Sequence, residues 1–533
     1  MSLRLYCGLT AIAGITTTLG VVYCYTAARY PWALLSGRVG HATLLIEAVF
    51  LIQYVWSIVR WVTYRPVEPV EDDNVLPSIT ILIPAYNESH FVRHALQAIL
   101  SSDYPKDKMS VTVVDDGSTD DTWCHIMAMA PIFKNAQLQY EPIRHDTNLG
   151  KRYAICTGLR EARGEVVVSL DSDSVLEPRS LRNIASPFVH DPKVGGVAGH
   201  LTALNVEGAV LPRLLDILFD SSGNFPRSAQ SQTGGFVTIL PGALSAYRLC
   251  AVYPLIEQLC DSRFLGRPLK HGEDVELTLG LLQAGWSTVY QSNAVIQTVA
   301  PEKCTVAFLM YTRWERSSYV YMLKGFSQMA ITRVLHSIRG QVFSGIRGIG
   351  TQTCKAAPQT SDRHIQTWII EPADAKESLA YLIGGLYMLL NLFCTAVGNP
   401  ILFAMSIYQI RLALFHLELL TITIPVMVVL PVFQAALFFA DSYPEPEVPA
   451  CSTFEKSKDI SGQAPATKTV SSHTASCTAV ASTAERGRLY DRRSRLAWRI
   501  QYGGLAGVFH AVVISFSSVY ALTTLRSQKW LTR

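Results

Sequence analysis

The segment VVVSLDSDSVLEP, residues 166–178, decides the fold because it runs an apolar, β-type stretch directly into two carboxylates, Asp171 and Asp173. In a parallel α/β sheet, ligands bind at the carboxyl ends of the strands, so acids at such an end can face a ligand. An isolated D-x-D pair is more often an ordinary turn than a metal site. The neighbouring segments therefore determine which interpretation holds.

Two earlier segments repeat this pattern of an apolar run that ends in polar residues. They are SITILIPAY at 78–86 and VTVVDDG at 111–117. Helix-like stretches at 89–101 and 150–162 lie between the β-type runs. This alternation predicts βαβ units and a mostly parallel sheet in an α/β domain.

The strand ends carry side chains suited to a nucleotide diphosphate. Parallel strands bring such ends to one edge, so their acids can converge on one ligand. Acids beside an anionic diphosphate need a divalent cation between them, and Mg²⁺ or Mn²⁺ binds one or two carboxylates together with phosphate oxygens. Asp115 and Asp116 are predicted to accept hydrogen bonds from a base or ribose, although DDGSTDD alone is equally a turn with a helix cap. Lys151 and Arg152 are predicted to neutralise phosphates.

Two later segments carry candidates for the reaction itself. In HGEDVELTLGLLQAGW, Glu273 and Asp274 open a helix-like run, where the macrodipole favours an ionised carboxylate that can act as a general base. Helix capping is the alternative interpretation. In YTRWERSSY, Arg313 can hold a diphosphate and Trp314 can stack on a sugar ring, whereas a membrane-interface anchor is the competing interpretation.

The composition predicts that part of the chain lies in lipid, since 49% of its residues are hydrophobic and only 17% are charged. About 20 apolar residues in a helix cross the ~30 Å hydrocarbon core of a bilayer. The first apolar run could also be a signal peptide. Candidate spans are residues 8–28, 42–59, 379–398, 417–440 and 503–524, with 400–416 as a doubtful addition.

Positive charges beside the second span favour a cytosolic position for the polar middle of the chain. Arg60 and Arg65 follow residues 42–59, and a cluster of arginines from Arg486 to Arg499 precedes residues 503–524. Cationic flanks of a span favour the cytoplasmic side. The eleven cysteines are scattered singly without a C-x-x-C pair, which also fits a reducing compartment. We therefore expect residues 60–375 in the cytosol, and a multi-pass protein of the plasma membrane.

Seven motifs between about residues 79 and 320 resemble those of the processive family 2 glycosyltransferases, which include hyaluronan, chitin, chitooligosaccharide and cellulose synthases. In family order they are IPAYNE, VVDDGSTDDT, NLGKRYA, LDSDS, LPGALSAYR, GEDVELT and TRW. The likeness is greatest to hyaluronan-synthase-like type 2 enzymes of fungi. The resemblance implies a GT-A fold that transfers a sugar from a UDP-sugar to a growing chain and often threads the product through its own spans.

The resemblance also implies roles for individual residues. Asp274 would be the catalytic base, and Asp171 and Asp173 would hold the metal and the diphosphate. Gly242, Glu273 and Trp314 would line the acceptor site. The remaining donor-binding residues would be Tyr86, Glu88, Asp115, Lys151 and Arg313.

Two positions depart from the family pattern. Met310 stands where the Q-x-x-R-W motif has glutamine, which removes a polar contact to donor or acceptor. Pro241-Gly242-Ala243 stands where hyaluronan synthases have S-G-P, at the loop where the acceptor sugar would end. Specificity and processivity are therefore less firmly predicted than sugar transfer.

The predicted fold class is α/β: a GT-A-type (Rossmann-like) cytosolic glycosyltransferase domain inserted between N- and C-terminal transmembrane helices. Residues 64–77 are a predicted linker, and 324–375 suit interfacial amphipathic helices or ordinary surface helices. The predicted segments are 1–63 (two spans), 64–77, 78–323 (GT-A domain), 324–375, 376–441 (spans), 442–500 (disordered loop) and 501–533 (last span and basic tail).

The predicted function is inverting transfer from a UDP-sugar, dependent on Mg²⁺ or Mn²⁺, that makes and exports a β-linked cell-surface or cell-wall polysaccharide. The partners are the donor, the growing polysaccharide and the lipid bilayer, with no nucleic acid. One alternative is transfer of a single sugar to a polyprenyl phosphate, which Arg313 and Trp314 disfavour. Another is a non-catalytic nucleotide-binding exporter, for which Met310 is the best support. The identity of the sugar and the oligomeric state are left open.

Overall fold

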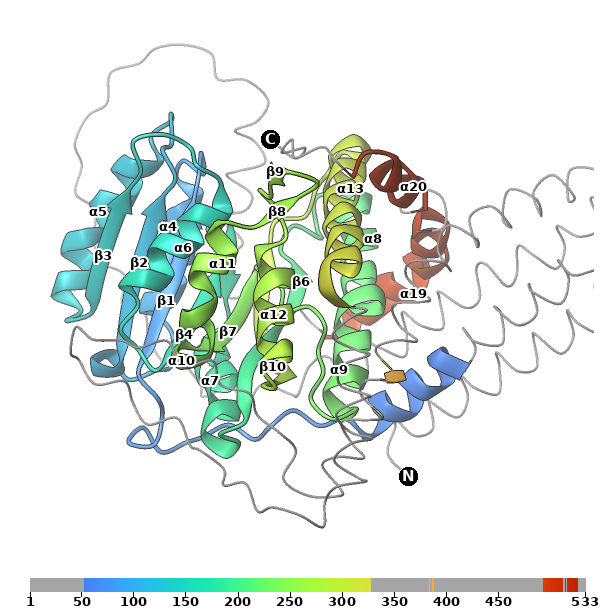
Figure 1. Ribbon diagram of the computed structural model, residues 1–533, viewed down its shortest axis with the longest axis horizontal. Helices are drawn as coiled ribbons and strands as arrows, with labels where there is room; N and C mark the ends of the chain where they lie inside the picture. Colours follow the sequence, from blue (N-terminus) through green and yellow to red (C-terminus); the bar gives the residue numbers. More distant parts are fainter. Residues whose placement is uncertain are drawn as a thin grey trace, which may run out of the picture.

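The computed structural model describes residues 52–326, 383, 386–387, 492–510, 513 and 515–525. A central sheet has helices on both faces, and a further group of helices lies at one side of it (Figure 1). Several predictions concern segments outside these described residues. The segments are residues 1–51, the interfacial segment after 326, the spans within 376–441 and the loop up to 491, apart from the positions just named.

The described strands have two to twelve residues, and the described helices have three to eighteen. The strands are β1 Ile79–Ala85, β2 Met109–Asp115, β3 Gln139–Arg144, β4 Val166–Leu170, β5 Ser174–Leu176, β6 Val194–Ala203, β7 Leu244–Arg248, β8 Arg263–Phe264, β9 Arg267–Pro268 and β10 Ser287–Thr298. The helices of the domain are α4 Phe91–Leu100, η1 Lys106–Lys108, α5 Thr122–Asn135, α6 Lys151–Glu161, α7 Ser180–His190, α8 Val210–Leu218, η2 Phe219–Asn224, α9 Phe225–Gln232, α10 Leu249–Val252, η3 Tyr253–Leu255, α11 Ile256–Cys260, α12 Glu273–Gln283, α13 Cys304–Tyr321 and η4 Met322–Phe326. Two later helices are α19 Arg492–Phe509 and α20 Ser515–Thr523.

The main sheet is mixed, with strand order β3-β2-β1-β4-β7-β6-β10-β5. The βαβ prediction is confirmed for β3, β2, β1 and β4, which are mutually parallel. The prediction of a mostly parallel sheet is also confirmed for β6 and β10, which run in the same direction as β4, and it is wrong only for β7 and β5, which are antiparallel to their neighbours. The direction of a strand depends on the connection that precedes it, which the apolar pattern of the strand does not report.

Both faces of the sheet are buried, which explains why the strands are nearly continuous apolar runs. Ile79, Ile81 and Ile83 of β1 pack against the layer formed by α4, α5 and α7. Leu82 packs on the opposite face, against the layer formed by α6, α10, α11 and α12 (Figure 1). With both faces covered, the strand ends are the places where the sheet can meet a ligand.

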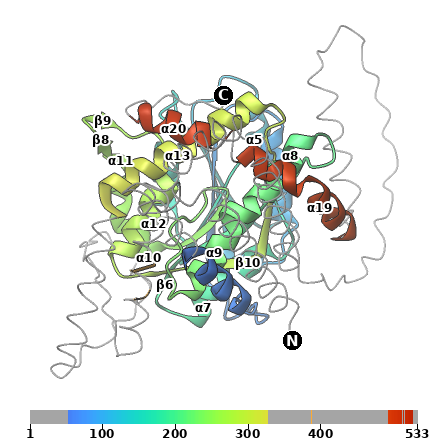
Figure 2. The ribbon, with the colours of Figure 1, turned by 90° about the vertical axis from the view of Figure 1, so that its right-hand side faces the viewer.

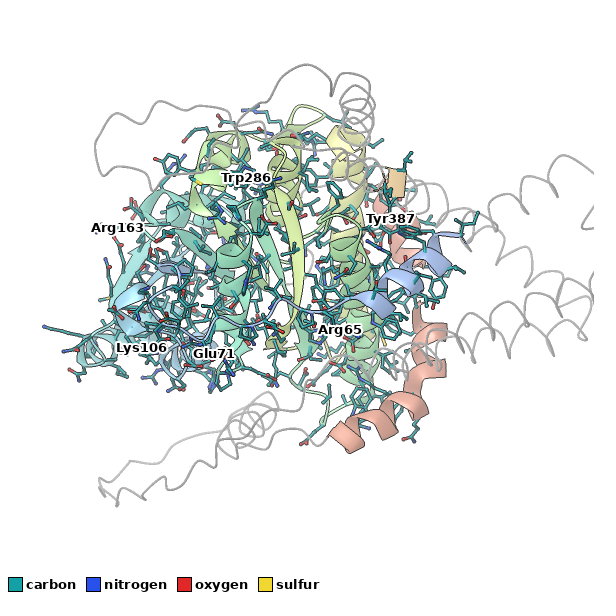
Figure 3. The ribbon with its side chains drawn as sticks, turned by 90° about the horizontal axis from the view of Figure 1, so that it is seen from below. Arg65, Glu71, Lys106, Arg163, Trp286 and Tyr387 are labelled. Carbon is teal, nitrogen blue, oxygen red and sulfur yellow. The ribbon has the colours of Figure 1, made fainter. Side chains whose placement is uncertain are left out.

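The predicted linker 64–77 is held against the domain by hydrogen bonds. Gln291 in β10 pairs with both backbone groups of Val67, at 3.0 Å to its nitrogen and 2.7 Å to its oxygen. Glu71 forms an ion pair with Arg179, with 2.5 Å between the oxygen and the guanidinium nitrogen. Figure 3 shows Arg65 and Glu71 along this extended stretch below the domain. The linker therefore fixes the helix at residues 52–63 relative to the sheet.

The later helices pack directly on the α/β domain, although more than 160 residues separate them from it in sequence. α19 lies against α8, and α20 lies against α13 (Figure 2). Trp498, Ala506 and Phe509 of α19 share a hydrophobic core with Met310 and Leu214. These helices therefore belong to the structural unit that carries the predicted site.

Three predictions for the end of the chain do not match the described residues. The loop predicted to continue through residue 500 ends earlier, since α19 begins at Arg492. The span predicted at 503–524 falls partly in α19 and partly in α20, and neither of these helices is both long and apolar enough to cross a bilayer. Arg499, predicted as a positive membrane flank, is instead buried in ion pairs with Asp216 and Asp220. Within the described residues, no helix is both long and apolar enough to cross a bilayer.

Candidate active site

The loops after β1 and β2 are joined by hydrogen bonds at the carboxyl edge of the sheet. The Asn87 backbone nitrogen donates to Ser118 Oγ at 3.0 Å, and Thr119 nitrogen donates to Asn87 Oδ1 at 2.9 Å. Glu88 nitrogen donates to Thr122 Oγ1 at 2.8 Å. These contacts bring the predicted donor residues Tyr86, Glu88 and Asp115 to one edge, because β1 and β2 pair in parallel up to Ala85 and Asp115.

The two adjacent acids of VVDDG have different surroundings. Asp115 is fully buried at the end of β2; its Oδ1 accepts from Ser118 nitrogen at 3.1 Å, and its Oδ2 lies 3.2 Å from Arg144 Nε. Asp116 accepts from the backbone nitrogens of Leu149 at 3.0 Å and Gly150 at 2.7 Å, and it also contacts His145. Asp115 therefore remains a donor-site candidate, whereas Asp116 shapes the loop that leads into α6.

Lys151 connects the donor edge to the first turn of α12. Its Nζ lies 2.5 Å from Asp171 Oδ1, just beyond β4, and 3.7 Å from Glu273 Oε1. Burial alone would lower the pKa of Lys151, but the charges of Asp171, Glu273 and Asp274 raise it above its usual value. Lys151 therefore carries a fixed positive charge between two groups of acids that are distant in sequence.

Asp274 sits against the loop that precedes β7. Its Oδ2 accepts from Gly242 nitrogen at 3.3 Å, and its Oδ1 accepts from Val275 nitrogen at 2.8 Å. A Cβ added to Gly242 would lie 3.2 Å from Lys151 Nζ and 3.8 Å from Asp274 Oδ2, so the backbone of this loop lies close to both charged groups. The structure therefore brings two donor-side residues, Lys151 and Asp171, together with Gly242, Glu273 and Asp274 on the base side, and we call these five residues the base cluster.

Burial raises the pKa of Asp274 to about 6, and the neighbouring Glu273 adds to this, while Lys151 and hydrogen bonds from Val275 and Gly242 oppose it. Loss of hydration is the largest of these influences, and it disfavours the charged form that the helix macrodipole is expected to favour. A carboxyl with this pKa can accept a proton near neutral pH more readily than an ordinary aspartate. A small cavity beside it is lined mostly by Leu82, Ile155, Leu159, Val167 and Leu277.

Arg152 does not contribute a cation to the donor edge, contrary to the sequence-based prediction. It is buried, and its guanidinium bonds Glu276 Oε2 at 2.5 Å, Tyr321 Oη at 2.7 Å and His271 oxygen at 2.8 Å. A guanidinium whose nitrogens are engaged by protein oxygens has little capacity left for a phosphate. The two residues could not be distinguished in the sequence, since Lys151 and Arg152 are adjacent cations.

Asp171 and Asp173 have the donor chemistry that a divalent cation prefers, because both are oxygen ligands at a strand end. Asp173 Oδ1 accepts from Ser174 Oγ at 3.2 Å and lies 3.5 Å from Thr298 Oγ1. In the part of the chain that the structure describes, no group of three His, Cys, Asp or Glu side chains forms a metal site. Mg²⁺ and Mn²⁺ need only one or two carboxylates beside substrate phosphates, so this pair is compatible with such an ion.

The helix α13 carries the remaining predicted residues, Arg313 and Trp314. Trp314 is 39% exposed, and its ring lies 5.2 Å from that of Tyr311 and 6.2 Å from that of Phe219, centroid to centroid. Trp314 is not among the residues whose contacts define the base cluster. Met310, which replaces the family glutamine, is buried in the core shared by α8, α13 and α19. An apolar residue suits that position.

One candidate was missed by the sequence reasoning. Arg227 lies on α9, and its Nε donates to Ile239 oxygen at 3.2 Å. Burial lowers the pKa of Arg227, while the nearby Tyr290 and Asp274 oppose that shift, so the guanidinium lies within electrostatic range of Asp274. Its segment, NFPRSAQSQ, has no charge pattern that distinguishes it from a surface helix.

Comparison with known proteins identifies the family. The model for "Glycosyltransferase like family 2" matches residues 77–317. An N-acetylglucosaminyltransferase of Azorhizobium caulinodans is 34% identical over 283 residues, which are 52% of this chain and 70% of that protein. Two further N-acetylglucosaminyltransferases are similar. The one from Rhizobium sp. is 31% identical over 52% of this chain and 62% of that protein. The one from Rhizobium meliloti is 33% identical over 47% of this chain and 58% of that protein. This chain covers less than two thirds of the length of each of the two Rhizobium proteins.

Solved structures show weaker likeness. A mannosyltransferase of Pyrobaculum calidifontis, in complex with GDP-Man and Mn²⁺, aligns with a TM-score of 0.41 at 22% identity over 70% of this chain and 92% of that one. TarS of S. aureus aligns with a TM-score of 0.32 at 19% identity over 50% and 44%. The fold assignment rests instead on the sheet topology and the family match. The chain belongs to glycosyltransferase-like family 2 and is a glycosyltransferase built on a GT-A-like, mixed α/β sheet.

Proposed function

We propose that the protein is a membrane-bound, inverting glycosyltransferase that uses a UDP-sugar, with Asp274 as its general base. The observation that carries this proposal is the base cluster: a buried carboxyl with a pKa of about 6 lies at the first turn of α12, beside a lysine that also contacts the strand-end acid Asp171. Such a pair offers proton acceptance and phosphate neutralisation at neighbouring positions.

The reaction follows from this arrangement. The Asp274 carboxylate takes the proton of an acceptor hydroxyl, whose oxygen attacks the anomeric carbon of the donor. The bond from that carbon to the diphosphate oxygen breaks, and its electron pair leaves with UDP. A single displacement of this kind inverts the anomeric centre, so an α-linked donor gives a β-linked product.

The donor side would neutralise the leaving diphosphate. Lys151 supplies a positive charge at the first residue of α6, and its contact with Asp171 would yield to phosphate oxygens when donor binds. Asp171 and Asp173 would hold Mg²⁺ or Mn²⁺, which would contribute further charge stabilisation when bound. Tyr86, Glu88 and Asp115 would contact the uridine, and the oxygen Asp115 Oδ2, which lacks a well-oriented hydrogen bond within the described residues, suits a ring N–H donor.

The names of the similar proteins favour UDP-GlcNAc as the donor. The relatives at 31–34% identity are named N-acetylglucosaminyltransferases. We propose β-linked GlcNAc oligomers or a polysaccharide as product, with a growing chain as acceptor. The processive hyaluronan and chitin synthases remain the group that the motif order favours, and the fungal likeness is part of the same proposal.

A position in the plasma membrane, with the catalytic domain in the cytosol, is proposed from the apolar segments on both sides of the domain. Transfer to a polyprenyl phosphate is a second outcome of the same assay rather than a favoured function.

The test is an incubation of the purified full chain, in detergent or nanodiscs, with each labelled UDP-sugar, singly and in pairs, with Mg²⁺ or Mn²⁺. We expect label from UDP-GlcNAc in a product that chitinase or β-hexosaminidase degrades. No transfer from any UDP-sugar would contradict the proposed function. A requirement for two donors would replace the homopolymer with a heteropolymer, and label only in a lipid extract would support the polyprenyl alternative.

A further inference from the structure

Arg152 is adjacent to Lys151 in the first turn of α6, yet it reaches a different part of the molecule. Its Nη1 donates to Glu276 Oε2 at 2.5 Å and to Leu259 oxygen at 3.0 Å. Its Nη2 donates to His271 oxygen at 2.8 Å and to Tyr321 Oη at 2.7 Å. One side chain therefore joins α6 to the end of α11, to the loop before α12, to α12 itself and to α13.

Glu276 is the acceptor at the centre of this group. Its Oε2 also accepts from Tyr321 Oη at 2.8 Å, and its Oε1 accepts from Ser262 Oγ at 2.7 Å and Lys324 Nζ at 2.8 Å. Glu276 is 5% exposed and Arg152 is 1% exposed, so the pair is shielded from water. We call Arg152, Glu276, Tyr321, Ser262 and Lys324 the Arg152 cluster.

Helix geometry links the Arg152 cluster to the base cluster. Successive residues in an α-helix are about 100° apart, so side chains two positions apart project in nearly opposite directions. Asp274 therefore contacts Gly242 and the base cluster, while Glu276 contacts Arg152. On α6, Lys151 contacts Asp171 and Arg152 contacts Glu276. A rotation or slide of either helix would change both clusters together.

The surroundings of Gly272 also show that α12 and α13 are tightly packed against each other. Gly272 precedes α12 with φ of +78°, and a Cβ there would lie 2.5 Å from Tyr321 Cε2 and 3.1 Å from Ser317 Cβ. The ring of Tyr321 thus packs against the backbone from which Glu273 and Asp274 project. Helix α13, through Tyr321, sets the position of the N-terminal turn of α12.

We propose that Arg152 is a positioning residue for sugar transfer: through Glu276 and Tyr321 it holds α6 and α12 in register, and so fixes Asp274 relative to Lys151. The inference rests on the proposed function, since it concerns the same reaction. It assigns Arg152 no contact with substrate. In some proteins, buried polar or ionic groups specify the registry between helices even where they add little stability.

The first test is Arg152→Lys in the full chain, which keeps the charge but cannot satisfy the four contacts of the guanidinium. We expect kcat to fall by about tenfold or more, with the donor KM and the affinity for UDP alone within about threefold of the wild type. The lower break of the pH profile of kcat/KM should also shift, because the surroundings of Asp274 change. Arg160→Lys, at an exposed ion pair on the same helix, is the matched control and should leave all of these quantities unchanged.

An unchanged kcat and pH profile in Arg152→Lys would overturn the inference. A loss of UDP affinity by about tenfold or more, measured without turnover, would also overturn it, because that result identifies a phosphate ligand. If wild-type protein transfers no sugar from any donor, the proposed function itself fails, and that outcome is seen before any variant is compared.

A second variant separates positioning from stability. Arg152→Met with Glu276→Met replaces the ion pair by apolar side chains of similar length, an exchange that is often neutral for stability. We expect a thermal midpoint close to that of the wild type, with kcat still reduced by about tenfold. Recovery of both the midpoint and the wild-type kcat would show that the pair is merely structural, and would overturn the inference.

Discussion

The two sides of the site are assembled in different ways. On the donor side, Tyr86, Glu88, Asp115 and Asp171 follow adjacent parallel strands, so local motifs and strand pairing suffice to bring them together. On the base side, Asp274 depends on a loop before β7, on α6 and on the packing of α13 against α12. The donor side is therefore specified by short-range sequence, and the base side by long-range contacts.

The difference extends to electrostatics. On the donor side, Asp171 beyond β4 is partly exposed, with a side chain 29% accessible, whereas Glu88 and Asp115 are buried. Asp274 is enclosed by apolar side chains and by Glu273, and these surroundings raise its pKa to about 6. Variants on the base side should therefore change the chemical step, and variants on the donor side should change the binding of UDP.

The largest expected effect is on the base side. Asp274→Asn preserves the shape of the side chain but cannot accept a proton, so we expect kcat to fall by about 10³-fold, within the range for loss of a general base. UDP affinity, measured by calorimetry, should stay within about threefold of the wild type. Asp261→Asn, at an exposed acid just after α11, is the matched control. Retained kcat in Asp274→Asn would remove the catalytic assignment.

The second-largest expected effect is on stability, through the packing of the C-terminal helices against the base side. Arg499→Met leaves Asp216 and Asp220 buried without their cation, which should lower stability by about 3–5 kcal/mol. Arg160→Met breaks an exposed ion pair and should cost about 0–1 kcal/mol. Thermal unfolding of both variants in the same detergent compares them. Equal midpoints would mean that α19 contributes no more to the domain than a surface contact.

On the donor side, Lys151→Met should weaken UDP binding by about 10–100-fold, because a charge-assisted contact to phosphate contributes about 1.5–3 kcal/mol. Lys134→Met, at an exposed position of α5, is the control. Calorimetric titration with UDP, with and without Mn²⁺, is the measurement. A fall in kcat with unchanged UDP affinity would assign Lys151 to the base side. The donor side would then no longer be the side whose variants change UDP binding.

The smallest effect expected is a shift in pH dependence. Asp274 must be unprotonated to act, so kcat/KM should rise with pH up to about 6 and level off above it. Glu273→Gln removes one of the charges that raise this pKa, so the break should move to lower pH. Initial rates across the pH range, at saturating metal, test both statements. A break that does not move in Glu273→Gln would mean that Glu273 does not influence the base.

The sequence predicted the strands and helices around the donor side well, for physical reasons that are visible in its motifs. β1, β2 and β4 form where apolar runs were found, and α4 and α6 lie within the predicted 89–101 and 150–162. The first turn of α12 also begins at the predicted Glu273. Periodicity and turn residues report local structure, and parallel pairing then follows from the βαβ order.

The sequence could not predict what depends on burial by distant segments. Lys151 and Arg152 look alike as adjacent cations, but only packing against α12 and α13 engages the second of them. Arg499 looked like a membrane flank because its partners, Asp216 and Asp220, lie about 280 residues earlier. The raised pKa of Asp274 likewise depends on apolar residues from β1, β4 and α6.

The central claim is that a single displacement, with Asp274 as base, transfers the sugar. The most direct test is the anomeric configuration of the new linkage, determined by NMR on product made from UDP-α-GlcNAc by the wild-type full chain. We expect a β-linkage. An α-linkage would require retention of configuration and would contradict both the single displacement and the role of Asp274.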